Sequence, residues 1–351
     1  MSSAPAPPGG LSPAEIARIL EQSRTELFEG ELRKGELFWA AYQPFLLSRG
    51  YKLRPRYDPD WVPTWKKLGK PIERLYDYED SITIEKGHVL DAVRVSDGRK
   101  VILKRVLTST EEIPIARYLS SEPLSSDPRN NAVPILDTIL LPNDDSSALI
   151  VMPLLLPLYA IPFRRVGEFA EAVRQYLQGL EFMHEHNIAH RDPCEFNLMM
   201  DASELIPSGF HFLRQRTYDG INEWDEWRER GSCESLRYYF IDFGLSRRYS
   251  SNTNVKDVGI WGQDRSYPER SSTVPYDPFK TDIYMLGNFI LRQVAEHDGL
   301  ECFRKIELLS LIGVQINTHA GYSSSAEFYS DPADPACSQL FPVFAVISLL
   351  S

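Results

Sequence analysis

The chain has 351 residues, of which 43% are hydrophobic and 25% are charged, the balance of a globular protein with ample apolar residues for a core. The formal net charge is −11. This excess of acids argues against nucleic-acid or anionic-membrane binding, because both need clustered basic side chains. The four cysteines show no metal-binding spacing, and no apolar run reaches the length of a membrane span. We therefore expect an intracellular protein of the cytoplasm or nucleus, with no nucleic-acid and no membrane partner.

The first 75 residues are expected to form an N-terminal extension that is disordered at first and then helical. Residues 1–11 are small and rich in Pro and Gly. Ser12, with Pro after it and Glu15 three positions later, predicts the start of a helix. Apolar spacing predicts a second short helix over residues 36–48. The aromatic and proline-rich stretch at 57–65 has no periodicity, which favours an irregular strap over a ligand site.

Several strands are predicted downstream of this extension. Two β-type runs, 89–95 and 100–106, flank an Asp-Gly pair, which is typical of a hairpin. The second run reads V-I-L-K and places Lys104 near its end. Two more strands are predicted at 133–141 and 148–152, and a P-L-L-L-P connection follows them. Between the two pairs, hydroxyl and acidic residues at 108–112 predict a helix start.

The second half of the chain contains the most informative spacing. Apolar residues recur at helical intervals over residues 166–183, and the segment at 190–197 then reads H-R-D-P-C-E-F-N. An apolar strand runs into D-F-G at 242–244. Further on lie P-E at 268–269 and D-x-x-x-x-G at 282–287.

These segments, in this order, resemble the motifs of the protein-kinase superfamily over roughly residues 80 to 298. The resemblance implies an α+β, bilobal protein-kinase-like fold, with a small antiparallel β-sheet lobe and a mostly helical large lobe. The small lobe would span residues 76–153. The large lobe would span 154–300, with an insert at about 201–237. An atypical C-terminal tail would cover 301–351.

The resemblance also implies a site for ATP. Lys104 would hold the α and β phosphates, and a Glu on the next helix would orient Lys104. The apolar pattern of that helix favours Glu112, with Glu111 as the alternative. Met152, at the end of the strand before the interlobe connection, belongs to the implied nucleotide-binding residues.

The remaining implied roles concern the metal and the acceptor. Asp242 and Asn197 would bind Mg²⁺, because carboxylate and amide oxygens are suitable hard ligands. Asp192 would accept the proton of the acceptor hydroxyl. His190 would brace the D-F-G segment. Arg191 would pair with a phosphate or an acid in the activation segment, which the resemblance places in the polar run at 246–257 and the P-E that follows it.

The chain also departs from the family in four places. Only Gly87 is present where a G-x-G-x-x-G loop would cover the phosphates. Cys194 stands where Ser/Thr kinases of the family carry a Lys, two positions after the catalytic Asp. Residues 306–351 contain neither Lys nor Arg, so a basic partner for Glu269 is not visible and the tail is expected to be loosely ordered. The insert, rich in Arg, Glu and Trp, is expected to be a solvated excursion, with a docking surface as the alternative.

Three functions follow from this pattern. The first is an ATP- and Mg²⁺-dependent protein kinase that phosphorylates Ser/Thr hydroxyls, with low activity. The second is a pseudokinase that acts as a nucleotide-binding scaffold or interaction module. The third is a small-molecule kinase, such as an aminoglycoside or choline phosphotransferase, which shares H-x-D-x-x-x-x-N. The D-F-G and P-E motifs and the Arg of H-R-D favour the protein-kinase branch.

Overall fold

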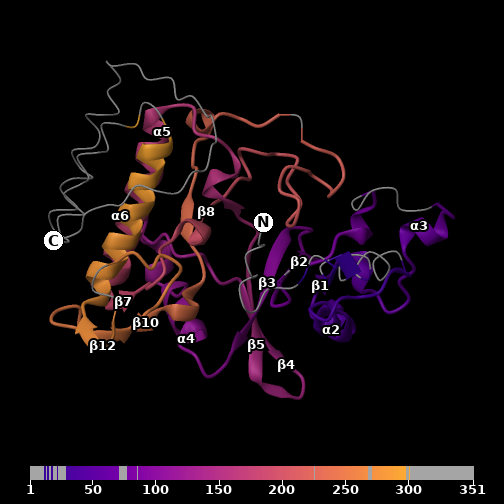
Figure 1. Cartoon of the computed structure of the whole chain (residues 1–351), viewed down its shortest axis with the longest axis horizontal. Helices are drawn as coiled ribbons and strands as arrows, with labels where there is room; N and C mark the ends of the chain where they lie inside the picture. Colours follow the sequence, from indigo (N-terminus) through magenta and orange to yellow (C-terminus); the bar gives the residue numbers. More distant parts are fainter. Residues whose placement is uncertain are drawn as a thin grey trace, which may run out of the picture. The chain divides into compact units, whose positions relative to one another are not determined.

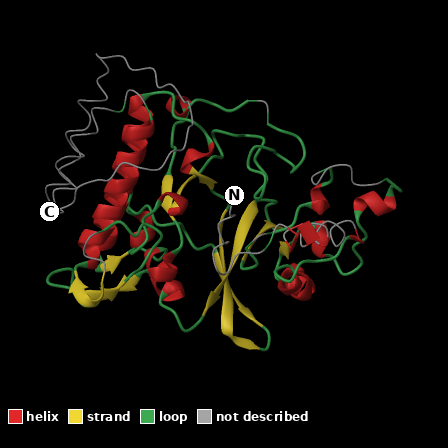
Figure 2. Cartoon of the chain, viewed as in Figure 1, coloured by secondary structure: helices red, strands yellow, loops and turns green. Residues whose placement is uncertain are grey.

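The computed structural model describes residues 29–70, 77–84, 86–224, 226–267 and 271–297, together with positions 12, 14, 15, 17, 18, 22 and 300. It combines α-helices with antiparallel β-sheets (Figure 2). The chain divides into two compact units. The first unit runs to Val101 and also contains Phe210–Glu223, and the second contains Ile102–Gly209 and the chain from Trp224 onward. The domain boundaries expected at residues 75, 153 and 300 stay predictions.

The first unit is built on aromatic side chains that pack around a buried ion pair. Its elements are α2 (Leu37–Ser48), β1 (Tyr51–Lys52), α3 (Thr64–Lys67) and β2 (Val89–Arg94), and β1 pairs with β2. Helix α2 confirms the predicted helix over 36–48. The fully buried Glu36 and Arg56 contact each other at 2.7 Å, and the hydroxyl of the buried Tyr57 donates to Glu36 at 3.1 Å. At the N-terminus, Ser12 and Glu15 exchange the reciprocal hydrogen bonds expected of a helix start.

The Asp-Gly pair forms the predicted turn after β2. Gly98 has a φ of 71°, a left-handed conformation that glycine adopts without steric cost. The Gly98 N–H donates to the Arg94 carbonyl at 2.8 Å, and the Arg94 N–H donates to the Arg99 carbonyl at 2.9 Å. The chain then enters β3 (Lys100–Leu107), which runs on into the second unit.

In the second unit, β3 lies next to β5 (Asp144–Pro153), and β5 pairs with β4 (Asp137–Leu141). Helix α4 (Glu112–Leu119) follows β3 (Figure 1). Strand β4 begins later than the predicted start at 133. The reason is a competing contact, since the Val133 N–H donates to the carbonyl of Phe240.

Two long helices form the body of the second unit (Figure 1). They are α5 (Val166–Glu185), which confirms the predicted helix over 166–183, and α6 (Pro278–Glu296). The two helices pack together where His184 Nε2 lies 3.0 Å from Asp282 Oδ2. Helix α6 begins at Pro278, ahead of the D-x-x-x-x-G motif, because the Asp277 carboxylate accepts hydrogen bonds from the first free backbone N–H groups.

Short strands lie before and between these helices, and several of them adjoin the motif segments. The strands β6 (Leu156–Pro157), β8 (Leu198–Met200) and β9 (Tyr238–Phe240) form one sheet. Two antiparallel pairs follow, β7 (Ile188–Ala189) with β10 (Arg247–Arg248), and β11 (Asp257–Gly259) with β12 (Ser271–Tyr276).

The insert between β8 and β9 differs from the solvated excursion that was expected. The side chains of Ile206, His211 and Arg230 are buried, so this part of the chain is packed. Residues Phe210–Glu223 belong to the first unit, where Lys100 Nζ donates to the carbonyl of Phe210 at 2.9 Å. Burial of a polar segment of this kind depends on distant partners, which local composition does not reveal.

Two further observations complete the fold. Within the described part of the chain, no helix combines the length and the apolar character needed to cross a bilayer. The expectations for Pro268 and Glu269, and for loose order in the tail at 301–351, fall outside the described residues.

Candidate active site

Lys104 is the centre of a buried charge cluster in the second unit. Strand β3 places its ammonium against the carboxylate of Glu112, the first residue of α4, and 2.8 Å from Oδ1 of Asp242. Of the two acids expected to orient Lys104, the structure therefore brings Glu112 to it. Glu111 turns elsewhere, since its carboxylate lies 3.6 Å from Arg247.

The three side chains of this cluster differ in the direction in which their surroundings shift the pKa. Burial alone would lower the pKa of Lys104, but the charges of Glu112 and Asp242 outweigh it and raise that pKa. Burial also raises the pKa of Glu112, against the opposing charge of Lys104. For Asp242, burial is outweighed by the charge and hydrogen bond of Lys104, and its pKa lies below the ordinary value. Asp242 thus stays ionised and available to a cation.

Asp242 and Asn197 lie at the same end of one strand pair. Asn197 directly precedes β8, Asp242 follows β9, and these strands are antiparallel with Leu198 opposite Phe240. The Ile241 N–H donates to the Asn197 carbonyl at 3.1 Å, which ties the two ends together. Asp242 has a φ of 65° and is half-exposed. Such a strained backbone at a polar residue is typical of functional sites.

Asn197 and Asp242 offer too few oxygens to enclose a metal ion by themselves, but their oxygens are of the kind that Mg²⁺ binds. Mg²⁺ keeps several waters and takes one or two carboxylates together with substrate phosphates. The described residues contain no group of three or more His, Cys, Asp or Glu side chains that could hold a metal ion. Lys104 and Gly244 both donate to Oδ1 of Asp242. The Asp242 carboxylate is thus partly engaged by donors of the protein itself.

The loop at 190–197 is anchored to α6 by Asp282, a fully buried residue. Its Oδ2 accepts the His190 N–H at 2.7 Å, and its Oδ1 accepts the Arg191 N–H at 2.6 Å. Arg191 has a φ of 67°, so the loop carries a strained backbone that this carboxylate holds in place. The sequence analysis assigned Asp282 to a motif but gave it no role; two backbone hydrogen bonds to a distant loop leave no local sequence signal.

His190 connects the loop to the D-F-G segment. Its Nε2 lies 3.1 Å from the Ile241 carbonyl, the Asp192 N–H points to its Nδ1, and its ring centre lies 5.3 Å from that of Phe243. Burial lowers the pKa of this imidazole, which is therefore neutral, with the proton placed on Nε2 by these partners. A neutral ring held at both nitrogens braces the segment rather than transferring protons.

Asp192 is engaged at both carboxylate oxygens. Asn197 Nδ2 donates to Oδ2 at 3.1 Å, and the Gln263 N–H donates to Oδ1 at 2.8 Å. The approach of Gln263 depends on the glycine before it, because a Cβ at Gly262 would lie 2.9 Å from both Asp192 Oδ1 and the carbonyl of Arg191. Gln263 is a contact that the sequence analysis missed.

Two other predicted positions are buried. Met152 lies near the end of β5, and none of the contacts described above involves it. Cys194 is 3% exposed, and burial, together with the charge of Asp192, raises its pKa to about 12. Its neutral thiol therefore supplies no positive charge beside Asp192.

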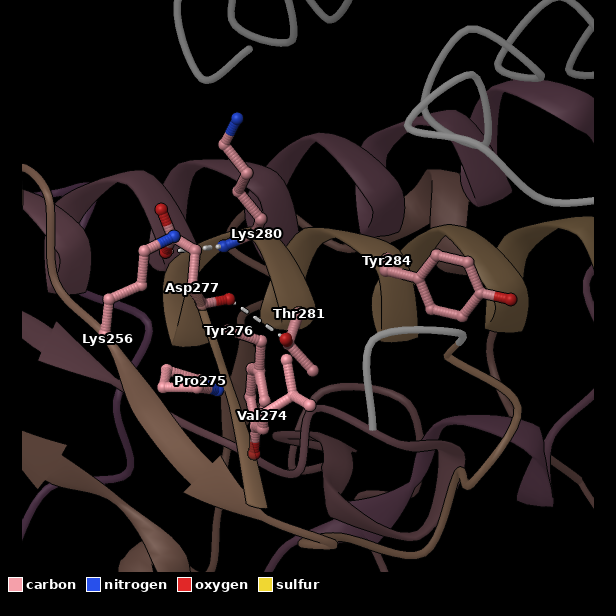
Figure 3. Close-up of a pocket in the computed structure, with 8 residues that line it drawn as sticks. All are labelled: Lys256, Val274, Pro275, Tyr276, Asp277, Lys280, Thr281 and Tyr284. Atoms are coloured by element: carbon pink, nitrogen blue, oxygen red, sulfur yellow. Dashed lines mark hydrogen bonds between the residues drawn. The ribbon is translucent and has the colours of Figure 1, made fainter. Parts of the chain in front are cut away.

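A pocket of about 350 Å³ lies apart from these residues, at the junction of β12 and α6 (Figure 3). Tyr276, Thr281 and Tyr284 contribute to its wall, and Lys280 stands at the start of α6. None of the predicted site residues lines it.

The chain was also compared with known proteins. No model of a known protein family matches it, and no curated protein matches its sequence.

Proposed function

We propose that this chain is a divergent, bilobal protein-kinase-like enzyme that transfers the γ-phosphate of ATP, with Mg²⁺, to Ser/Thr hydroxyls of proteins. The observation that carries the proposal is the Lys104 ammonium held between Glu112 and Asp242. Beside it, His190 belongs to the loop at 190–197, here called the catalytic loop. Its ring contacts Asp192 in the same loop and the carbonyl of Ile241, directly before D-F-G, which links the two motifs. Phosphoryl transfer depends mainly on this kind of positioning and charge placement.

The roles of the individual residues follow from their remaining bonding capacity. An ammonium has three donors, and Lys104 uses two on carboxylates, which leaves one for a phosphate oxygen. Asn197 and Asp242 would hold Mg²⁺, which neutralises phosphate charge when bound. Both oxygens of Asp192 accept hydrogen bonds from the protein, and a carboxylate has about four lone-pair sites, which leaves capacity for the acceptor hydroxyl.

The alternative is a pseudokinase that binds nucleotide without turnover. Cys194 is buried and neutral, so one cation near the transferring phosphate is missing. Gly87 has another role in the first unit, because a Cβ there would lie 2.8 Å from the Cα of Gly35, and its carbonyl accepts a hydrogen bond from Trp39. The backbone of Gly87 therefore lies close to that of Gly35, and Gly87 does not supply a phosphate-binding loop.

Thermal unfolding with nucleotide tests the proposal. A ligand present at 100 times its Kd stabilises the folded state by about 2.7 kcal/mol. We expect ATP with Mg²⁺ to raise the Tm, ATP without Mg²⁺ to raise it less, and Asp242→Asn to abolish the difference. Asp201→Asn is the matched control and should behave as wild type. Asp201 lies after β8, and its carboxylate accepts a hydrogen bond from the Ser203 N–H in a turn. An equal shift with and without Mg²⁺ would contradict the assigned ligands.

A further inference from the structure

Residues 210–223, the part of the insert that belongs to the first unit, are here called the insert loop. Lys100, on β3, donates from Nζ to the carbonyl of Phe210 at 2.9 Å. Further along the loop, Gly220 has a φ of 96°, and a Cβ there would lie 2.9 Å from Cδ1 of Ile82. The loop is therefore in close contact with the first unit.

His211 connects the insert loop to the first unit and is 4% exposed. Its Nδ1 accepts hydrogen bonds from the backbone N–H groups of Leu213 and Arg214, both at 3.2 Å. Because Nδ1 is an acceptor, the single proton of the neutral ring lies on Nε2, which donates to Oε1 of Glu79 at 3.3 Å. One ring therefore shapes a turn within the loop and also binds the loop to the first unit.

Glu79, the partner of His211, is also held by Arg54. The Nε of Arg54 donates to Oε1 of Glu79, and its Nη2 donates to the Glu79 carbonyl at 2.8 Å. Burial alone would raise the pKa of Glu79, but the hydrogen bond from His211 and the charge of Arg54 outweigh it and bring that pKa below its ordinary value. Glu79 therefore stays ionised in mildly acidic solution, and a change of charge at this contact comes from the imidazole.

Three further charged groups lie around this contact. Asp91, on β2, is buried, and burial raises its pKa, so it takes up a proton at a higher pH than an ordinary Asp. Lys100 donates to the backbone of the loop, and Arg214 donates from Nη1 to the carbonyl of Gly220 at 3.1 Å. Of these three groups, only Asp91 would attract a positive charge on the loop, and this attraction is lost once Asp91 is protonated.

Protonation of His211 conflicts with this arrangement. An imidazolium is a donor at both nitrogens, so a proton on Nδ1 would face the two backbone N–H groups that now donate to it. We propose that His211 is a pH-sensitive clasp, whose neutral ring holds the insert loop on the first unit and whose protonation releases the loop. The released loop binds the proton more tightly than the docked loop, so acidification favours release. The ordinary charge change of imidazole falls between about pH 5 and 8, which sets the range.

The clasp sets how many times the chain connects the two units. While the insert loop is docked, the chain passes between the units after Val101, after Gly209 and after Glu223. Once the loop is released it no longer belongs to the first unit, and only the passage after Val101 remains. Acidification should therefore leave the two units freer to move independently. The clasp works without ATP and is independent of the proposed kinase function.

Hydrogen exchange of the full chain between about pH 7.5 and pH 5, across the range in which imidazole titrates, tests this proposal. Each exchange rate is divided by the rate of an unstructured chain at the same pH, which gives a protection factor. In the wild type, protection of residues 211–223 should fall with pH by up to roughly tenfold per pH unit, the limit for one proton, while α5 keeps its protection.

His211→Asn removes the titrating group and keeps an acceptor for the turn, because an Asn side chain accepts hydrogen bonds from backbone N–H groups two and three residues on. Its insert loop should be less protected than that of the wild type at pH 7.5, since the bond to Glu79 is lost. That lower protection should no longer change with pH. His297→Asn is the matched control at the end of α6, where His297 Nδ1 lies 3.0 Å from the Gln293 carbonyl, and it should keep the wild-type pH profile.

Two further variants check the readout and the identity of the titrating group. Gly220→Ala should lower protection of the insert loop at every pH, because its Cβ would meet Ile82. Asp91→Asn should keep the pH dependence. The proposal is overturned if wild-type protection of the loop does not change with pH, if His211→Asn keeps the wild-type pH dependence, or if Asp91→Asn abolishes it.

A measurement on the wild type decides if His211→Asn does not fold. The charge state of the His211 ring is followed by NMR over the same pH range. We expect the ring to gain its proton as the insert loop loses protection. A ring that stays neutral while the loop opens, or one that becomes charged while the loop stays protected, overturns the proposal.

Discussion

At the scale of single residues, the proposed phosphoryl-transfer site combines several carboxylates with the single ammonium of Lys104. Lys104 shares its one charge between two carboxylates, and Asp192 is held by Asn197 and by the backbone of Gln263. The thiol of Cys194 adds no charge. In the proposed enzyme, a nucleotide would thus be bound and oriented while the transition state lacked the cation that the family carries at position 194.

The missing cation leads to a prediction about turnover. A preorganised charge in a water-excluded site is typically worth about 3–4 kcal/mol of transition-state stabilisation, or roughly 10²–10³ in rate. We expect Cys194→Lys to raise the rate of phosphate transfer to a generic protein substrate, with little change in ATP affinity, because the cation acts mainly on the transition state. The uncharged Cys194→Met controls for side-chain size.

Asp192→Ala sets the background for that measurement. It should remove phosphate transfer and leave ATP binding largely intact. If wild type and Cys194→Lys are both inactive, the pseudokinase is the correct description. If wild type is as fast as an ordinary kinase, another cation supplies the charge assigned to position 194.

At the scale of elements, α5 supports the strands β8 and β9. The ring of Tyr176 lies 5.2 Å from that of Phe240 on β9, and the Tyr176 hydroxyl donates to the Met199 carbonyl at 2.9 Å. The helix approaches β9 so closely at Gly179 that a Cβ would lie 2.9 Å from Asn131 Cβ and 3.0 Å from the Phe240 ring. Dense packing here fixes the strand that leads into D-F-G.

This packing predicts the effect of Gly179→Ala. In an open helix the change would stabilise by about 1 kcal/mol through helix propensity. Overpacking of a dense interior costs about 1–3 kcal/mol. The added Cβ would meet the Phe240 ring and the Asn131 Cβ, and neither can move aside easily. We therefore expect a net loss of up to about 2 kcal/mol in the free energy of unfolding, measured by urea denaturation. A more stable variant would show that α5 can move away from β9.

At the scale of the whole molecule, buried acids in the first unit differ in how well they are compensated. Asp80 accepts hydrogen bonds from Trp61 and Thr64. Asp91, on β2, is buried with no hydrogen bond to Oδ1, and burial raises its pKa, with the charge of Arg54 opposing. At neutral pH the Asp80 carboxylate should therefore stabilise the folded state, whereas the Asp91 carboxylate should destabilise it.

The pH dependence of unfolding tests this difference. Because the folded-state pKa of Asp91 lies above the unfolded value, the folded state binds the proton more tightly, and stability falls as pH rises between the two values. Asp91→Asn should therefore be more stable than wild type at neutral pH, and the difference should vanish near pH 4 and below, around the ordinary Asp pKa.

Asp80→Asn is the matched control in the same unit. It should lose about 1–3 kcal/mol at neutral pH, because it disturbs acceptors that satisfy buried donors. A less stable Asp91→Asn variant at neutral pH would show that the attraction of the Arg54 charge outweighs the cost of burying the Asp91 carboxylate.

Local features of the sequence determined the elements that carry the site. Helical spacing predicted α5, the Asp-Gly pair predicted the turn at Gly98, and the apolar run placed Lys104 on β3. The same helical register favoured Glu112 over Glu111 as the residue facing Lys104. These features depend on neighbours within a few residues, which propensity and periodicity describe directly.

Tertiary structure alone decided which distant groups meet. The pairing of Arg191 with Asp257, the anchoring of the loop by Asp282 and the packing of the insert around His211 join residues far apart in the chain. No periodicity links such residues, because each is a single polar group whose partner is chosen by the fold. A buried charge is stable only beside an opposite charge, and only the folded chain shows that Arg191 has this charge in Asp257.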